Sequence, residues 1–450
     1  MAAALTYNTV RMQQKQALEI MKMGHNVFLT GEAGTGKTHV LSNYIKFLKT
    51  KSIPTAICAS TGIAATHLEG VTLDSWTGLG IADDVTQQDI EKLSYKYHLV
   101  RRVNRAKVLI IDEISMIHGR RFDAADRIVR YLRKNSLPFG GLQVILSGDL
   151  FQLPPVSKNR QELDFIFTSR AWHDLDLRIC YLYEPRRQSD RDFLKVLNDI
   201  RRNNISAYTK DTLSQTIKNH LGAFTPTRLY THNVDVDAIN KHELDKINNQ
   251  SQFYYMSTLG KEVVVDTLKR TCLSPQILEL KKGAVVMFVK NNYEKGYVNG
   301  TLGKVAGFDR NNDPVVETYS HKKITVEPAS WTITEDNDKI VAQITQHPLR
   351  LAWAITVHKS QGMTLDAAEI DLSKSFVEGM GYVALSRVRS LKGLRLLGFN
   401  DMALRVNPRI SSIDGELRRL SDEIESNFNK LGPIRRFLKK YKFMYSLTSP

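Results

Sequence analysis

The sequence predicts an α/β fold, and two patterns along the chain lead to that prediction. Across residues 1–180, short apolar runs alternate with segments of helical periodicity. Such runs, bounded by turn or charged residues, are typical of strands buried on both faces of a parallel sheet. After about residue 280 the alternation stops, and short strands follow one another with turn signals between them. We therefore expect a parallel sheet with its helices, and a smaller antiparallel region inserted later in the chain.

The alternating part contains one clear helix and several strands. In residues 120–135, five apolar side chains from Phe122 to Leu132 recur at helical spacing, and Arg and Asp occupy the other face. The strand candidates are residues 26–30, 55–60, 107–111 and 143–147.

The later part reads as a small antiparallel barrel at residues 281–346, followed by renewed helix–strand alternation near Leu349. Asn299-Gly300 and the run 311–314 are turn signals. The strand candidates here are residues 283–290, 301–308, 315–319 and 323–326.

The tail holds an amphipathic helix that ends at Gly432-Pro433, a helix-stop pair. Residues 430–442 carry six basic side chains and no acidic one. Such a run most often forms a solvated helix face. Interleaved aromatic residues also allow packing on the protein, with an auxiliary role in binding nucleic acid. The apolar face of the first helix consists of Ile413, Leu417, Leu420, Ile424 and Phe428.

Composition narrows the class of protein. With 450 residues, 42% hydrophobic and 24% charged, the chain is globular rather than disordered or fibrous. Its 63 Lys+Arg exceed its 47 Asp+Glu by 16. That surplus suits a polyanionic partner and a merely soluble basic protein equally well. The three cysteines are scattered, the N-terminus does not resemble a signal peptide, and no apolar run is long enough to span a membrane. We therefore expect a soluble, intracellular protein without a membrane partner.

The sharpest motif is GEAGTGKT at residues 31–38, which fits the phosphate-loop pattern GxxxxGK[ST]. Its glycines let backbone N–H groups surround a phosphate, and the next helix adds its positive end. Lys37 is expected to reach the β and γ oxygens of ATP, and Thr38 to bind Mg²⁺. The candidate nucleotide-binding residues are Gly31, Glu32, Ala33, Gly34, Thr35, Gly36, Lys37 and Thr38.

A second motif is the apolar strand that ends in Asp112-Glu113. Asp112 would hold Mg²⁺ directly or through water, and Glu113 would polarise the attacking water as general base. A buried strand can end in acids by chance, but the phosphate loop makes the catalytic interpretation stronger. The adjacent Asp-Glu favours hydrolysis over transfer of phosphate to a small molecule.

Together with further motifs, these segments resemble the superfamily 1B DNA helicases of the petite-integration-frequency (Pif) type, with RecD-like helicases next closest. The resemblance runs from about residue 10 to 405, and residues 113–135 resemble the signature segment of the family. The segments that carry it are residues 31–38, 59–65, 110–116, 148–156, 231–240, 358–364 and 382–388.

The resemblance implies two RecA-like motor lobes with two insertions. The first lobe would be 1–180 with a wedge at about 66–80, and the second 181–280 together with 347–405. A Src-homology-like barrel at 281–346 would be inserted in the second lobe, and 406–450 would form a basic helical tail.

The resemblance also implies residue roles around the nucleotide. Gln14 matches the glutamine that reads adenine, with Gln13 as the alternative if the register shifts by one, and Gln152 matches a γ-phosphate sensor beside Asp149. Two arginines from the second lobe would neutralise the charge that develops on the transferring phosphoryl group. These arginine fingers, and the residues that couple the cleft to the strand, match Arg187, Arg387, Gln361 and Gly362.

DNA contacts are implied at Thr61, which follows a strand, because short hydroxyls and amides bind phosphates without reading sequence. Asp74 stands where the family often has histidine, so no direct phosphate contact is expected there. For Trp76, Tyr293 and Tyr297, packing is favoured over stacking on bases. The further matches are Thr72, Thr231, Asn233, His358 and Ser360.

The resemblance thus predicts an ATP- and Mg²⁺-dependent helicase that travels 5′-to-3′ on single-stranded DNA and unwinds duplex or structured DNA. Its partners would be single-stranded DNA and single-strand/double-strand junctions, and it would act as a monomer. The residues alone establish a nucleotide-hydrolysing switch that binds a polyanion. Two alternatives stay open: an ATP-driven remodeller that displaces proteins without separating strands, and a RecD-like subunit of a larger DNA-processing complex.

Overall fold

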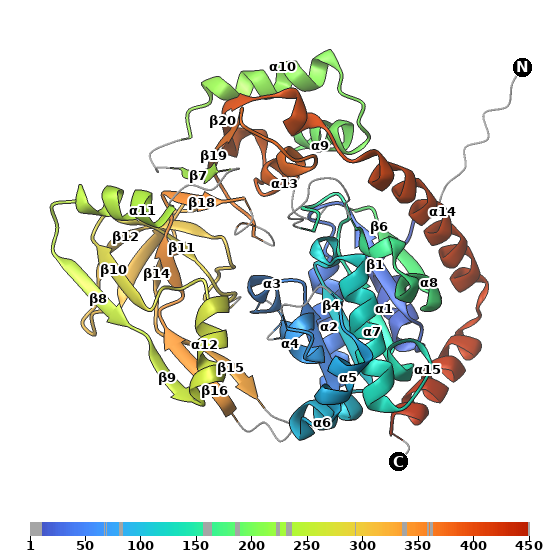
Figure 1. Cartoon of the computed structure of the whole chain (residues 1–450). Coiled ribbons are helices and arrows are strands. Elements are labelled where there is room, and N and C mark those ends of the chain that lie inside the picture. The colour runs from blue at the N-terminus through green and yellow to red at the C-terminus, as the bar shows by residue number, and fades with distance from the viewer. Residues whose placement is uncertain are drawn as a thin grey trace, which may run out of the picture.

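The computed structural model describes residues 11–66, 68, 70–80, 84–155, 164–184, 190–221, 226–230, 236–292, 294–334, 340–357, 360 and 363–448. Its architecture is a mixed α/β arrangement with two parallel sheets and a separate antiparallel region (Figure 1). Within the described ranges, no helix has both the length and the apolar character that crossing a bilayer requires.

The first parallel sheet has six strands in the order β3-β2-β4-β5-β1-β6. Alternate residues of each strand face opposite cores: Phe28 of β1 packs with α7, whereas Val27 and Leu29 pack with α1 and α2. All four strands predicted for this part are confirmed, and so is the helix predicted at 120–135. The strands are β1 (Val27–Gly31), β2 (Thr55–Ala59), β3 (Val71–Thr72), β4 (Val108–Asp112), β5 (Gln143–Ser147) and β6 (Arg178–Leu182).

Helices cover both faces of this sheet, as the cores on its two sides show. They are α1 (Gln14–Lys22), α2 (Lys37–Thr50), α3 (Gly62–Thr66), α4 (Leu73–Thr77), α5 (Gln87–Ser94), α6 (Tyr97–Arg105), α7 (Gly119–Arg133) and α8 (Arg170–Asp174).

The second parallel sheet has four strands in the order β18-β7-β19-β20, and it lies beyond the carboxyl-end side of the first sheet (Figure 1). Its strands are β7 (Thr227–Tyr230), β18 (Ala354–Thr356), β19 (Ala368–Leu372) and β20 (Leu394–Phe399). The helices of this part are α9 (Arg191–Arg201), α10 (Ala207–Gln215), α11 (Val236–Asp245) and α13 (Met380–Ser386).

The antiparallel region forms three sheets, in the orders β14-β13-β12-β11-β17, β15-β16-β9 and β10-β8. The four strands predicted within it are confirmed as β11 to β14. The strands are β8 (Ser251–Tyr255), β9 (Ser257–Gly260), β10 (Ile277–Lys281), β11 (Val285–Phe288), β12 (Leu302–Phe308), β13 (Pro314–Thr318), β14 (Lys323–Thr325), β15 (Ala329–Thr334), β16 (Ile340–Gln346) and β17 (Leu349–Leu351), with α12 (Glu262–Thr271) among them.

Two of the predicted boundaries differ from the strand pairing. Strand β6 pairs with β1 along its whole length, so the first sheet extends past residue 180 to Leu182. The antiparallel pairing begins at Ser251 and ends at Leu351, which is wider than the predicted range 281–346. Strands β8 to β10 were not predicted, because no turn pair of the Asn-Gly type lies next to them in the sequence.

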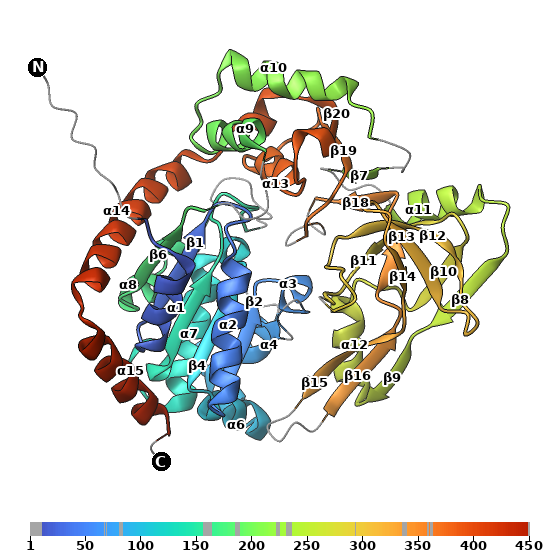
Figure 2. The ribbon, with the colours of Figure 1, turned by 180° about the vertical axis from the view of Figure 1, so that it is seen from behind.

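The tail returns to the first sheet as two helices, α14 (Pro408–Lys430) and α15 (Pro433–Thr448), along its outer side (Figure 2). The predicted apolar face is confirmed, because Leu417 and Phe428 are buried and Ile413, Leu420 and Ile424 are partly buried. The hydroxyl of Ser421 accepts a hydrogen bond from the backbone N–H of Tyr181 at 3.0 Å. Helix α14 is therefore packed along β6, the edge strand of the first sheet.

Candidate functional site

The phosphate loop lies between β1 and α2, as the motif requires. Gly31 has φ +143°, and a Cβ there would lie 2.3 Å from the carbonyl oxygen of Leu182. Gly36 has φ +86°, and a Cβ there would lie 2.2 Å from Nε2 of Gln14. Gly31 therefore requires glycine because of its backbone conformation and the close backbone oxygen, whereas at Gly36 the left-handed backbone conformation alone favours glycine, since the end of the Gln14 side chain can move.

Lys37 is turned into its own loop. Its Nζ donates hydrogen bonds to the carbonyl oxygens of Gly31, at 2.9 Å, and Glu32, at 3.0 Å. Burial lowers the pKa of Lys37, and the carboxylates of Asp149, Glu113 and, more weakly, Asp112 oppose that shift. The ammonium group is thus surrounded by acceptors that phosphate oxygens can replace.

Gln14 lies beside the phosphate loop. Its Nε2 donates to the carbonyl oxygen of Thr35 at 2.9 Å, across 21 residues of sequence. Gln13, the alternative register, is exposed at the start of α1. The geometry favours Gln14 as the residue next to a bound nucleotide.

Asp112 and Glu113 end the central strand β4 at the same edge of the sheet. Burial raises the pKa of the Asp112 carboxyl group, and its Oδ1 accepts a hydrogen bond from the N–H of Glu113 at 2.9 Å. Glu113 adopts a left-handed backbone conformation with φ 51° and ψ 48°, which is unfavourable for a non-glycine residue. This conformation turns the chain sharply where the predicted general base stands.

The oxygen donors that could hold Mg²⁺ are the hydroxyl of Thr38 and the carboxylate of Asp112. Both are hard ligands that suit this ion. Among the described residues, no group of three or more His, Cys, Asp or Glu side chains could form an all-protein metal site. In nucleotide sites Mg²⁺ is usually bound by one or two protein oxygens together with phosphate oxygens and water.

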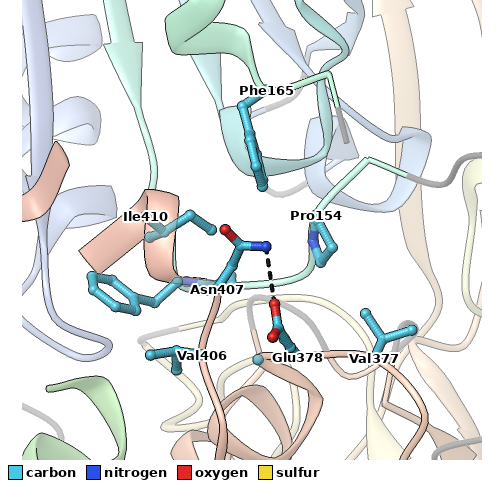
Figure 3. A pocket seen from close by; sticks show the side chains of 10 residues that line it. Pro154, Phe165, Val377, Glu378, Val406, Asn407 and Ile410 are labelled. Atoms are coloured by element: carbon cyan, nitrogen blue, oxygen red, sulfur yellow. Dashed lines mark hydrogen bonds between the residues drawn. The ribbon is translucent and has the colours of Figure 1, made fainter. Parts of the chain in front are cut away.

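The loop after β5 places Asp149 and Gln152 next to the second sheet's elements. Gln152 is 5% exposed, and its backbone N–H donates to the carbonyl oxygen of Asp149 at 2.9 Å. It lines a small cavity, together with Pro154, between this loop, the segment that precedes α13 and the start of α14 (Figure 3). In that cavity Nδ2 of Asn407 donates to Oε2 of Glu378 at 2.9 Å.

Arg387 lies at the C-terminal end of α13 and is 1% exposed. Its Nε donates to the carbonyl oxygen of Val383, at 3.0 Å, and its Nη2 to the hydroxyl of Ser386, at 3.0 Å. Burial lowers the pKa of the guanidinium group, and the charge of Glu113 opposes that shift more strongly than its other neighbours do. Two donor atoms of Arg387 are therefore bound within its own helix.

The described candidates for DNA binding have structural partners of their own. The hydroxyl of Thr61 accepts from Ala64 N–H at 3.2 Å, and that of Thr72 accepts from Ser75 N–H at 3.2 Å, so each caps a short helix. Ser360 is buried, and its hydroxyl donates to the carbonyl oxygen of Val357 at 2.7 Å. Three further DNA-binding candidates lie outside the described residues: Thr231, Asn233 and His358. The same is true of three candidates for the nucleotide site: Arg187, Gln361 and Gly362.

Asp74, the departure from the family pattern, forms an ion pair of 2.8 Å with Arg121 of α7. The aromatic candidates for base stacking that the structure describes are packed against other side chains of the protein. Trp76 is buried in the core of the first sheet, and Tyr297 stacks on Phe288 with ring centroids 4.1 Å apart. Tyr293 lies outside the described residues.

Sequence reasoning missed the residues that surround Asp149. Arg201 donates from Nη1 to both carboxylate oxygens of Asp149, at 2.8 and 2.9 Å, and from Nη2 to Asp414 at 3.2 Å. The only sequence signal was an arginine directly after the apolar face of a helix. Nothing local in the sequence links residues 149, 201 and 414.

Comparisons with known proteins identify the family of the chain. A family model described as PIF1-like helicase matches residues 9–211, and one described as the DNA helicase Pif1 2B domain matches residues 264–308. The chain is 42% identical to the ATP-dependent DNA helicase Pif1 of Psychrobacter sp., over 93% of this chain and 73% of that protein. It is 36% identical to the ATP-dependent DNA helicase PIF1 of Homo sapiens, over 94% of this chain and 67% of that protein.

Solved structures are similar as well. A Bacteroides sp. Pif1 in complex with ADP-AlF4 superposes with a TM-score of 0.79 at 31% identity, covering 94% of this chain and 99% of that one. Pif1 helicase from Candida albicans superposes with a TM-score of 0.71 at 33% identity, covering 92% and 100%. With 42% identity to a Pif1 helicase over 93% of its length, the chain belongs to the PIF1-like helicases, a family of ATP-dependent DNA helicases.

Proposed function

We propose that the chain hydrolyses Mg²⁺-ATP between its two parallel sheets and uses the cycle to travel 5′-to-3′ on single-stranded DNA, unwinding duplex or structured DNA ahead of it. The observation that carries the proposal is the convergence of charged residues where α13 meets the phosphate loop. Lys37, Asp112 and Glu113 come from the first sheet, and Arg387 caps α13, whose Tyr382 hydroxyl accepts from the N–H of Ala33 in the loop at 3.4 Å.

The chemistry follows from these positions. Lys37 would exchange its backbone acceptors for the β and γ oxygens of ATP, and Glu113 would orient and deprotonate the attacking water. Mg²⁺, held by Thr38 and Asp112, would neutralise charge on the same oxygens. Arg387 would leave its contacts with Val383 and Ser386 to meet the charge that develops on the γ-phosphoryl group, with Arg187 as a second finger.

Support for DNA as the track comes from the relatives and from the charge of the chain. One similar structure is described as Bacteroides Pif1 bound to single-stranded DNA, and another as two coordinating Pif1 helicases at forked duplex DNA. The formal surplus of +16 offers counterion release on binding a phosphate backbone. We expect a monomer that works inside the cell, with Thr61 and Thr72 among its contacts to the strand.

The test is unwinding of a duplex that carries either a 5′ or a 3′ single-stranded tail, with and without Mg²⁺-ATP. We expect product from the 5′-tailed duplex alone, and only with ATP. Product from the 3′-tailed duplex would contradict the polarity. ATP hydrolysis stimulated by single-stranded DNA without any product strand would favour a protein remodeller. Unwinding by the isolated chain would exclude an obligate RecD-like subunit.

A further inference from the structure

A buried polar cluster joins both sheets and the tail helix around one arginine. We call Asp149, Tyr181, Arg201, Tyr382 and Asp414 the Arg201 cluster. The Nη1 atom of Arg201 donates to Asp149 and, at 3.0 Å, to the hydroxyl of Tyr382; Nη2 donates to the hydroxyl of Tyr181 at 2.9 Å and to Asp414. Arg201 is 3% exposed and Asp149 is fully buried.

The cluster touches the phosphate loop through Tyr382. The Tyr382 hydroxyl donates to Oδ2 of Asp149 at 3.1 Å and accepts from the backbone N–H of Ala33 at 3.4 Å. A second contact comes from the tail, where Arg418 of α14 lies 3.8 Å from the carboxylate of Glu32. Two consecutive residues of the loop are therefore in contact with elements far away in the sequence.

Stability alone does not account for such a cluster. Buried ion pairs pay a large desolvation cost, and well-packed apolar residues often replace them without loss. Burial alone would lower the pKa of Arg201, yet Asp149 and its other neighbours hold it well above its ordinary value. The guanidinium group is thus firmly charged and fixes the geometry of all its acceptors.

Tyr382 and Arg387 lie on the same short helix, α13 with its C-terminal cap. We propose that Tyr382 is a positioning residue: its hydroxyl holds α13 against the phosphate loop and Asp149, and so sets where Arg387 stands relative to the γ-phosphate. When phosphate engages the N–H groups of the loop, the Ala33 contact changes, and the helix that carries Arg387 responds. This inference rests on the proposed hydrolytic role of Arg387.

Two tyrosines of the cluster give a matched pair for the test. Tyr382→Phe removes the hydroxyl that contacts Ala33 and Asp149, and Tyr181→Phe removes one that also binds Arg201 but is linked to the loop only indirectly, through Arg418. We expect Tyr382→Phe to lower the kcat of ATP hydrolysis about tenfold with little change in KM, the cost of one hydrogen bond to a charged group. Tyr181→Phe should keep kcat within about twofold, although both variants lose thermal stability. Equal kcat values in the two variants would overturn the proposal.

Combining variants separates this inference from the proposed function. If Tyr382 acts through Arg387, adding Tyr382→Phe to Arg387→Ala should cause no further loss of kcat, because the losses are then not additive. A further tenfold loss would overturn the positioning role. Should Tyr382→Phe fail to fold, Arg201→Lys is the substitute, because it keeps the positive charge but loses the forked guanidinium group that binds Tyr382 and Asp149 together. A wild-type kcat in Arg201→Lys would also overturn the positioning role. Failure of the proposed function would be detected in a different variant, as ATP hydrolysis that persists in Lys37→Ala.

A different observation concerns helix α15. One face packs on the first lobe through Phe443, Met444 and Leu447, with the ring of Phe443 lying against Gly24 and Lys440 paired with Glu19. The opposite face is bare in the described structure. Its large apolar side chains are between 56% and 75% exposed: Ile434, Phe437, Leu438, Tyr441 and Tyr445.

The charge of α15 indicates what covers this face. The helix carries five Lys or Arg side chains and no acidic one. Two of its exposed rings, Phe437 and Tyr441, are stacked with their centroids 6.4 Å apart and their planes at 23°. Aromatic rings among positive charges bind single strands by stacking on bases while cations meet the phosphates. A second copy of the chain is a less suitable occupant of this face, because two basic α15 helices would repel each other. We infer that this face of α15 is an accessory surface for single-stranded nucleic acid.

Binding of labelled oligo(dT) to the full chain, measured by anisotropy over a range of salt, tests the surface. Phe437→Ala/Tyr441→Ala/Tyr445→Ala should weaken binding about tenfold or more. Arg435→Ala/Lys439→Ala/Lys442→Ala should reduce the salt slope by about 2. Tyr95→Ala/Tyr97→Ala, which removes two rings exposed elsewhere, is the control and should leave binding unchanged. Unchanged affinity and slope in both α15 variants would overturn the inference and leave the face to a protein partner.

Discussion

The two walls of the proposed nucleotide site are built in different ways. The first wall comes from one parallel sheet, where the phosphate loop and Asp112-Glu113 follow strands β1 and β4 directly. The second wall comes from α9 and α13, whose Arg201, Tyr382 and Arg387 are buried, and the partners of Tyr382 lie up to 349 residues away. The first wall is a local consequence of sequence; the second depends on the whole fold. Variants that break each wall should therefore fail in different ways.

The largest effect is expected from the first wall. Lys37→Ala removes the cation that meets the β and γ oxygens, so we expect ATP hydrolysis to fall by about a thousandfold and unwinding to be lost. DNA binding should remain measurable, because the strand contacts lie elsewhere. Steady-state hydrolysis and anisotropy with single-stranded DNA are the measurements. Lys46→Ala, an exposed lysine of the same helix, is the matched control; unwinding retained by Lys37→Ala would refute the mechanism.

On the second wall, Arg387→Ala should lower turnover by about a hundredfold with nucleotide affinity nearly unchanged. The reason is that Nε and Nη2 of Arg387 donate to groups of its own helix in the present conformation, so the side chain would engage phosphate only as charge develops. Titration with a fluorescent nucleotide and single-turnover hydrolysis separate the two quantities. Arg389→Ala changes an arginine two residues away that is half exposed and pairs with Asp366 at 3.3 Å. Both variants should bind nucleotide alike, and wild-type turnover in Arg387→Ala would remove its role.

A smaller effect is expected at Gln14, the residue proposed to bind the adenine base of ATP. Gln14→Ala should raise the KM for ATP about tenfold, the cost of one or two hydrogen bonds, and leave kcat close to wild type. The neighbouring Gln13→Ala is the control, because that side chain is exposed and should have no effect on KM. An effect of Gln13→Ala instead would restore the alternative register.

The same contrast explains what could be predicted from the sequence. The loop from Gly31 to Thr38 and the strand that ends at Asp112 are contiguous, so periodicity and spacing locate them, and a resemblance adds Gln14 and Arg387. The Arg201 cluster joins residues 149, 201, 382 and 414, and only tertiary packing brings these together. The first sheet extends past residue 180 and the antiparallel pairing begins before residue 281, because strands β6, β8 and β9 are identified by their partners rather than by their composition.

The smallest effect should come from Asp74, far from both walls. Its ion pair with Arg121 is partly exposed, at 32% and 15% of the two side chains, so the solvent screens much of the attraction. Asp74→Asn should lower the free energy of unfolding by about 0.5 kcal/mol in low salt, and high salt should abolish the difference. Arg121 keeps its 2.8 Å bond to the carbonyl oxygen of Gly80, which limits the loss. Denaturant titration measures the effect, with Asp84→Asn as a comparison at a more exposed pair with Arg127. If Asp74→Asn instead strengthens DNA binding without a change in stability, then this carboxylate repels the phosphate backbone, and its part in the fold is minor.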